Sequence, residues 1–142
     1  MLKEWTLTYI KNRDILLRRI SKIEDKGEYF LITHADESHV VVVVKEIISD
    51  FVAILDRLRE LEKLHTATKL TLVVYNTEDN MSHVIRHWNE LIALSTLTII
   101  FVNTATNEKW SVSPYVHHKI ADPETLEQGL KALFESVTVH SS

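Results

Sequence analysis

The sequence contains no cysteine, so it offers no disulfide framework and no thiolate nucleophile, and nothing in it favours secretion. Only two glycines occur, Gly27 and Gly129, which are too few to form a Walker loop or the glycine-rich fingerprint of dinucleotide-binding domains. The two commonest nucleotide-binding signatures are therefore excluded, whereas nucleotide binding in general is not.

Long apolar runs are absent as well. No stretch approaches the roughly 18 consecutive apolar residues of a membrane-spanning helix. The first residues, Met1 to Trp5, lack the architecture of a signal peptide. We therefore expect a cytoplasmic protein without a membrane partner. The length of 142 residues and the hydrophobic fraction of 45% are typical of one globular domain, covering residues 1–142.

The charge of the chain is small, negative and unevenly distributed. The net charge of −4 argues against a protein built mainly to bind duplex nucleic acid, which would carry a basic surface. Residues 1–26, however, contain seven Lys or Arg and four Asp or Glu, so the remainder of the chain is strongly acidic. This excess fits either a basic face on the first helix or an ordinary solvated helix surface.

The most informative pattern is a repeat. Residues 70–80 and 97–107 have identical residues at five positions, including Asn76 and Asn103, and each copy holds an apolar run followed by a polar loop. Such runs are typical of strands buried on both faces. A helical pattern lies between them, at residues 81–93. Strand, helix and strand in this order predict a right-handed unit with two parallel strands.

The other elements are predicted from periodicity, turn residues and caps. We expect a first helix at residues 6–25, a hairpin of two strands at 28–34 and 39–45, and a long apolar helix at 46–64. A second hairpin, at 107–120, should turn near Ser113-Pro114, and a last helix, at 122–137, is opened by Asp122-Pro123-Glu124. The predicted fold is a single three-layer α/β domain. Its sheet is mixed and mostly parallel, with helices on both faces and an antiparallel hairpin at an edge.

Ligands of open parallel sheets bind beyond the carboxyl ends of the strands. This rule selects polar residues that follow the predicted strands, and we predict a ligand site at Lys45, Asn76, Thr77, Asn103 and Thr104. The same residue types cap helices and build turns, so a purely structural role is the alternative interpretation.

A weaker candidate is a metal site on the helix predicted between the repeats. His83 and His87 are four residues apart and share a helix face, and Glu90 follows three residues later. Two imidazoles at this spacing can chelate a transition metal. Exposed histidines without a metal are the alternative interpretation, and we expect no cofactor.

The predicted order of a helix, antiparallel strands, a helix and a strand, over roughly residues 10–75, resembles the core of the restriction-endonuclease-like family. The resemblance implies an Asp followed by an acid-x-Lys motif, which together hold a divalent metal for phosphodiester hydrolysis. Asp36 matches the first acid and Lys45 the lysine, but Val43 stands where the second acid is required. Since the metal needs both carboxylates, the resemblance implies an inactive domain.

No G-x-S-x-G motif occurs, so nucleophilic catalysis has no recognisable centre. We therefore expect a non-catalytic interaction or ligand-sensing module. The apolar stripe of the 46–64 helix is broader than one sheet contact requires, which predicts a homodimer. The alternative is a degenerate restriction-endonuclease-like domain that binds nucleic acid.

Overall fold

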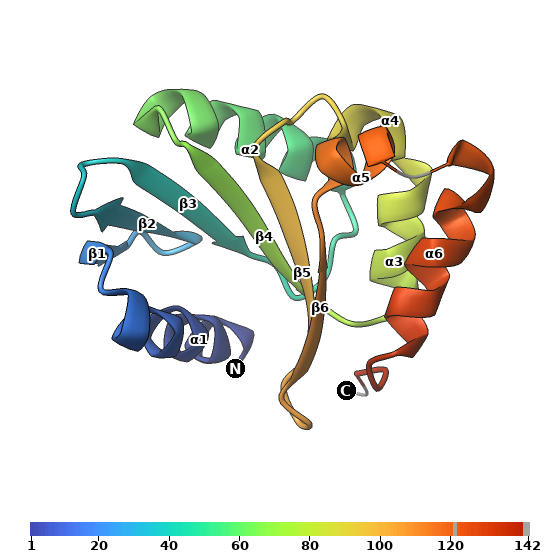
Figure 1. The fold of residues 1–142 in the computed structure, drawn as a ribbon, viewed down its shortest axis with the longest axis horizontal. Coiled ribbons are helices and arrows are strands. Elements are labelled where there is room, and N and C mark those ends of the chain that lie inside the picture. The colour runs from blue at the N-terminus through green and yellow to red at the C-terminus, as the bar shows by residue number, and fades with distance from the viewer. Residues whose placement is uncertain (121, 141–142) are drawn as a thin grey trace.

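The computed structural model describes residues 1–120 and 122–140, which form a single α/β domain. Its centre is a mixed sheet of six strands that lie side by side in the order of the chain (Figure 1). The strands are β1 (Ile20–Asp25), β2 (Tyr29–His34), β3 (His39–Val44), β4 (Lys69–Tyr75), β5 (Leu97–Asn103) and β6 (Glu108–Val112).

Antiparallel pairing predominates in this sheet. β1 with β2, β2 with β3 and β5 with β6 are antiparallel, whereas β3 with β4 and β4 with β5 are parallel. The predicted α/β class and mixed sheet are confirmed, but the prediction of a mostly parallel sheet was wrong. Two antiparallel pairs were not predicted. β1 was predicted as part of a helix, and β6 was expected to pair with the residues after Pro114 but pairs with β5.

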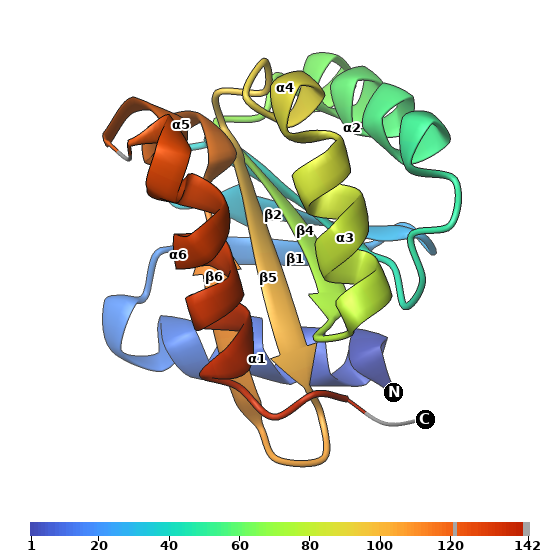
Figure 2. The same ribbon diagram turned by 90° about the vertical axis from the view of Figure 1, so that its right-hand side faces the viewer.

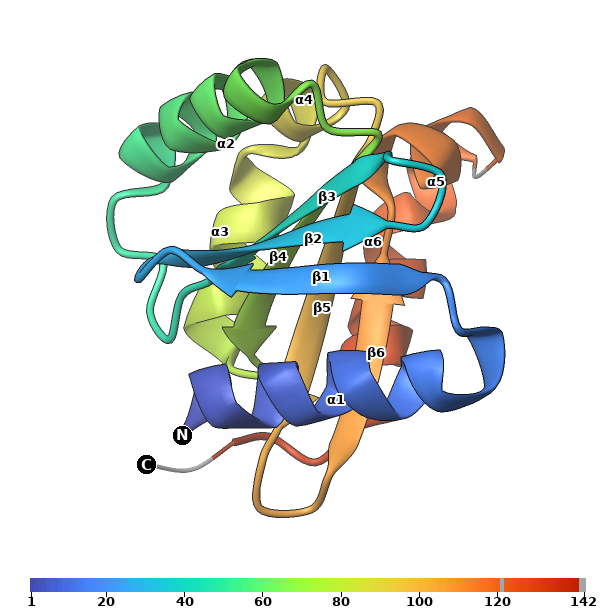
Figure 3. The ribbon, with the colours of Figure 1, turned by 90° about the vertical axis from the view of Figure 1, so that its left-hand side faces the viewer.

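Helix α1 (Leu2–Leu17) lies across one face of the twisted sheet (Figure 3). The opposite face carries a layer of helices, as the view in Figure 2 shows. These helices are α2 (Phe51–His65), α3 (Glu78–Arg86), α4 (Trp88–Leu91), α5 (Pro114–Ile120) and α6 (Pro123–Glu135). None of the helices in the described part of the chain is long and apolar enough to cross a membrane.

The five consecutive valines of β3 explain how both faces acquire a core. Val41 and Val43 are buried among the residues that pack against α2, α3 and α4. Val40 and Val42 point the other way, toward the apolar side chains of α1. Alternation along the strand thus turns one apolar run into two cores, as the sequence predicted.

The first predicted helix was too long, because residues 20–25 form the edge strand β1. Arg18 adopts a left-handed conformation, with φ of 49°, and ends the helix. The carboxylate of Asp14 then accepts the backbone N–H groups of Arg19 and Ile20, at 2.8 and 3.1 Å. Gly27, with φ of 92°, turns the chain from β1 into β2 instead of ending a helix.

The repeated segments are parallel neighbours, as predicted. Leu70 pairs with Leu97 and Thr71 with Thr98, so identical residues lie side by side. This register brings Asn76 and Asn103, which follow the last paired residues of the two strands, to the same sheet edge. Between the strands, the single predicted helix is divided into α3 and α4 at His87.

The second predicted hairpin was wrong. Residues 108–112 form β6, but Pro114 opens α5 instead of turning into another strand. Proline fits the first turn of a helix, where its missing N–H costs nothing. The prediction for α6 was better, since Asp122 caps it by accepting the N–H of Glu124 at 3.1 Å. α2 begins at Phe51, later than predicted, because Asp50 caps it.

Candidate functional site

One face of α1 carries a row of large side chains. Trp5, Tyr9 and Arg13 are spaced four residues apart, so they emerge from the same side of the helix. The rings of Trp5 and Tyr9 are stacked, with centroids 5.2 Å apart and planes inclined by 12°. The Arg13 guanidinium extends the row, and its Nη1 lies 3.4 Å from the Tyr9 hydroxyl.

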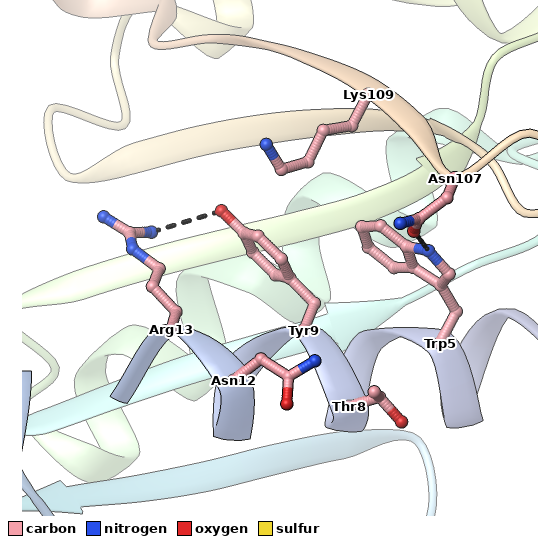
Figure 4. A pocket seen from close by; sticks show the side chains of 7 residues that line it. All are labelled: Trp5, Thr8, Tyr9, Asn12, Arg13, Asn107 and Lys109. Carbon is pink, nitrogen blue, oxygen red and sulfur yellow. Dashed lines mark hydrogen bonds between the residues drawn. The ribbon is translucent and has the colours of Figure 1, made fainter. Parts of the chain in front are cut away.

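The β5–β6 hairpin faces this row from the other side (Figure 4). Asn107, in the turn, holds its backbone in the left-handed region with φ of 61° and accepts a hydrogen bond from Trp5 Nε1 at 2.7 Å. Lys109, on β6, places its Nζ 5.2 Å from the centre of the Tyr9 ring. The hairpin therefore supplies one amide and one ammonium group to the same aromatic pair.

Between the two walls lies an open hollow of about 600 Å³, which we call the aromatic cleft. It is lined by Trp5, Thr8, Tyr9, Asn12, Arg13, Asn107 and Lys109. None of these lining residues is acidic, although the chain as a whole has a net charge of −4. The cleft combines two cations, two amides and an aromatic surface. Chemically, it suits a ligand that carries both an anionic group and a flat ring.

The sequence prediction missed the aromatic cleft. Its two walls are far apart in the chain, since Trp5 and Asn107 are separated by 102 positions. Two signals were present on the α1 side, namely the i, i+4 spacing of Trp5, Tyr9 and Arg13 and the basic excess of residues 1–26. Neither signal identified the opposite wall.

The predicted site at the carboxyl ends of the strands has a different character. Asn76 is fully buried. Its Nδ2 donates to the backbone oxygens of Val137 and Thr138, at 3.2 and 3.3 Å. Its Oδ1 accepts the indole N–H of Trp110 at 2.8 Å. The amide therefore ties the C-terminal segment and β6 to the end of β4.

The partner of Asn76 in the repeat has a similar role. Asn103 Nδ2 donates to the backbone oxygen of Thr138 at 2.9 Å, and its Oδ1 accepts N–H groups within its own turn. Thr77 caps α3 by accepting the N–H of Asn80 at 3.2 Å, and Thr104 lies half-buried in the β5–β6 turn. The ligand-binding prediction for these residues stays a prediction, and both Asn amides are already engaged within the protein.

Lys45 lies apart from the aromatic cleft. Together with Glu28, Asp50 and Arg57 it lines a separate hollow of about 330 Å³ at the start of α2. Glu28 is bound there by Arg57, whose Nε lies 2.7 Å from Glu28 Oε1. The Asn and Thr residues predicted beside Lys45 do not line this hollow, and the ligand-binding prediction for Lys45 stays a prediction.

The acid and lysine of the restriction-endonuclease-like motif do not converge. Asp36 lies in the turn that joins β2 to β3, and Lys45 follows the far end of β3. A strand of six residues separates them, which is about 20 Å. The residue of β2 opposite Val43 is Tyr29, so the hairpin offers no carboxylate at that level. The hypothesis that Asp36 and Lys45 form one centre is therefore wrong.

The paired histidines pack against an aromatic ring. Both imidazoles stack on Phe51 of α2, with ring centroids 6.4 Å away for His83 and 4.8 Å for His87. Across residues 1–120 and 122–140, no three His, Asp or Glu side chains are gathered as a metal site would require. The metal-binding prediction for His83 and His87 therefore lacks a third ligand among these residues.

The chain matches no protein-family model, no curated protein and no solved structure with which it was compared.

Proposed function

We propose that the chain is a non-catalytic ligand-binding module, and that its ligand binds in the aromatic cleft. The observation that carries this proposal is the stacked pair of Trp5 and Tyr9, flanked by Lys109 and Arg13 in an open hollow. An aromatic surface beside two cations attracts a flat ring that bears a negative group. A nucleotide is the simplest ligand of this kind.

The residues around Val43 favour a binding role over phosphodiester hydrolysis. A hydrolase of the restriction-endonuclease-like type needs two carboxylates on one metal, whereas Val43 and Tyr29 face each other at the corresponding level of the sheet. Within residues 1–120 and 122–140, no cluster of metal ligands replaces them.

Tryptophan fluorescence tests the proposal directly. Trp88 and Trp110 are buried, so Trp5 is the tryptophan that a ligand in the cleft can reach. Adenosine monophosphate at millimolar concentration should quench this emission, whereas inorganic phosphate alone should not. The Tyr9→Ala and Lys109→Gln variants should lose the response. An unchanged emission spectrum with adenosine, guanosine, cytidine and uridine monophosphates would contradict the proposal.

A second candidate function has one observation in its favour. The chain begins with α1, three antiparallel strands, α2 and the parallel strand β4, which follows the restriction-endonuclease-like order more closely than the sequence prediction did. This candidate is a degenerate nucleic-acid-binding domain of that type. Both candidates are non-catalytic. The first rests on the aromatic cleft, whereas the second rests on the order of the helices and strands.

The protein is expected not to cleave nucleic acid. Purified chain incubated with plasmid DNA, single-stranded DNA and RNA, with either Mg²⁺ or Mn²⁺, should leave all substrates intact because the second acid is absent. The matched controls are Asp36→Ala and Lys45→Ala. Cleavage that one of these substitutions abolishes would replace the binding module with a nuclease.

A further inference from the structure

We infer that the ligand of the aromatic cleft is a single strand of nucleic acid, which continues along α1 beyond the cleft. This inference rests on the proposed function and specifies its ligand. A mononucleotide would use only the cleft itself. The inference therefore depends on what lies next to the cleft.

A second hollow, of about 180 Å³, opens beneath the C-terminal half of α1. Tyr9 and Arg13 line both hollows, so the two adjoin. We call the second one the sheet groove. Its floor is apolar, because Val73 of β4 and Ile100 of β5 are buried there beneath the helix. A strand that leaves the cleft past Tyr9 would enter this groove.

Positive charge continues into the sheet groove. Arg19 and Lys69 line it, in addition to Arg13, and both side chains are exposed. Lys69 reaches this face because it alternates with the buried Leu70 along β4. The lining contains one acid, Asp14, whose carboxylate already accepts two backbone N–H groups.

Four cations therefore follow one path over a protein of net charge −4. They are Lys109, Arg13, Arg19 and Lys69. Neutralising phosphates with such a row favours a polymer over a single nucleotide, since every additional phosphate contact releases counterions.

The length of the path leads to the same inference. From Trp5 to Leu17, α1 rises about 18 Å, at 1.5 Å per residue. Nucleotides stacked at about 3.4 Å along one strand would place roughly five in this distance, and an extended strand would place fewer. A single nucleotide occupies only a fraction of this length.

A single strand fits better than a duplex. The bases of a duplex are stacked on each other and cannot enter the aromatic cleft, whereas those of a single strand expose their faces. Stacking on aromatic side chains with cations along the backbone is the usual arrangement for binding single strands. DNA and RNA share this chemistry, and their relative affinities are left to the experiment.

Fluorescence anisotropy with labelled decamers of thymidine and of uridine, at 50 mM NaCl, tests the inference. At least one decamer should bind more tightly than a duplex of the same length. Tyr9→Ala should weaken binding by about fivefold to a hundredfold, the usual loss of one stacked base. Lys69→Gln should weaken it several-fold and reduce the salt slope by about 0.7, the contribution of one phosphate contact.

The Lys69→Gln variant separates the two proposals, because Lys69 lies outside the aromatic cleft. It should leave quenching by adenosine monophosphate unchanged. Lys131→Gln, on α6 across the sheet, is the matched control and should bind decamers as the wild type does. Circular dichroism spectra should confirm that each variant is folded, and Lys109→Gln, at an exposed position, replaces Tyr9→Ala if that variant unfolds.

Several results would overturn the inference. Quenching by mononucleotides without decamer binding would refute it and leave the proposed function intact. Tighter binding of the duplex would also refute it. Equal binding of heparin, unaffected by Tyr9→Ala, would assign the surface to polyanions in general. The failure of both ligands would refute both proposals.

Discussion

Single side chains in this protein take their roles from residues far away in the chain. Asn76 and Asn103 occupy equivalent positions of a repeat, and the sequence correctly suggested that they would meet at one sheet edge. It could not show that Val137, Thr138 and Trp110 would occupy their amides, because those contacts depend on where the C-terminal segment lies. Polar residues at strand ends are therefore ambiguous until the whole chain is placed.

The structural role of the two amides makes a clear prediction. Asn76→Ala should destabilise the protein by about 1–3 kcal/mol, because Trp110 Nε1 and the backbone oxygens of the C-terminal segment lose a buried partner. Asn103→Ala should cost a similar amount. Urea unfolding measures both. Asn12→Ala, at an exposed position of α1, is the control and should change stability by less than about 0.5 kcal/mol. If neither Asn76→Ala nor Asn103→Ala changes the free energy of unfolding, the structural role is wrong and this sheet edge becomes a candidate ligand site.

His65 makes a prediction about pH. Burial, with a smaller effect of His39, holds the pKa of His65 below its ordinary value. The unfolded chain then binds the proton more readily than the folded one. The stability that neutral His65 contributes is therefore complete above about pH 6.5 and is lost as the pH falls toward the lowered pKa.

The His65→Gln substitution should consequently reduce the loss of melting temperature between pH 7.5 and pH 5.5. His118→Gln, exposed on α5, serves as the comparison and should preserve the wild-type difference. If His65→Gln and the wild type show the same pH dependence, the lowered pKa does not contribute to acid lability.

At the scale of elements, periodicity and turn chemistry predicted most of the architecture. The valines of β3, the two repeated strands and the cap of α6 were all found as predicted. The errors lie where two local patterns compete. Ile20 and Ile23, three residues apart, fit an apolar helix face, and they pack on one side of β1 only because the strand register shifts between Ile20 and Lys22. The left-handed Arg18, which no glycine signals, ends the helix before them.

Gly129 shows a second limit of local sequence analysis. A glycine within a helix suggests close packing, yet a Cβ atom added to Gly129 would meet nothing within 4 Å. Gly129→Ala should therefore stabilise the protein by up to about 1 kcal/mol, because alanine loses less backbone entropy in a helix. Thermal and urea unfolding measure this gain. The control is Gly27→Ala, where φ of 92° should make the same substitution destabilising. A destabilised Gly129→Ala variant would show that α6 requires the glycine.

At the scale of the whole molecule, exposed apolar side chains near the start of α2 bear on the proposed homodimer. Most of the apolar stripe of α2 is buried in the core, including Phe51, Leu58 and Leu61. What remains exposed near its start is Ile47, at 75%, and Val52, at 58%. The proposal of a homodimer now depends on these two side chains, and not on the full stripe that the sequence suggested.

Sedimentation tests the homodimer. The wild type at micromolar concentration should sediment as a dimer, and Val52→Glu should convert it to a monomer, because a charge in an apolar contact is unfavourable. Asp56→Lys, one turn further along α2, changes the charge outside the apolar pair Ile47 and Val52 and should have a weaker effect. A wild-type protein that remains monomeric at every concentration would contradict the proposal.

The junction at Asn76 also affects the order in which the molecule is completed during its synthesis. Thr138, whose carbonyl Asn76 binds, is added 62 residues later. At about 5–20 residues per second, translation takes roughly 3–12 s to cover that interval. Until then the amide has only water as a partner for its N–H groups, and this end of β4 lacks its native cover. The segment around Thr138 thus covers this end of β4 only after that interval, and a chaperone that binds exposed strands would find its opportunity in those seconds.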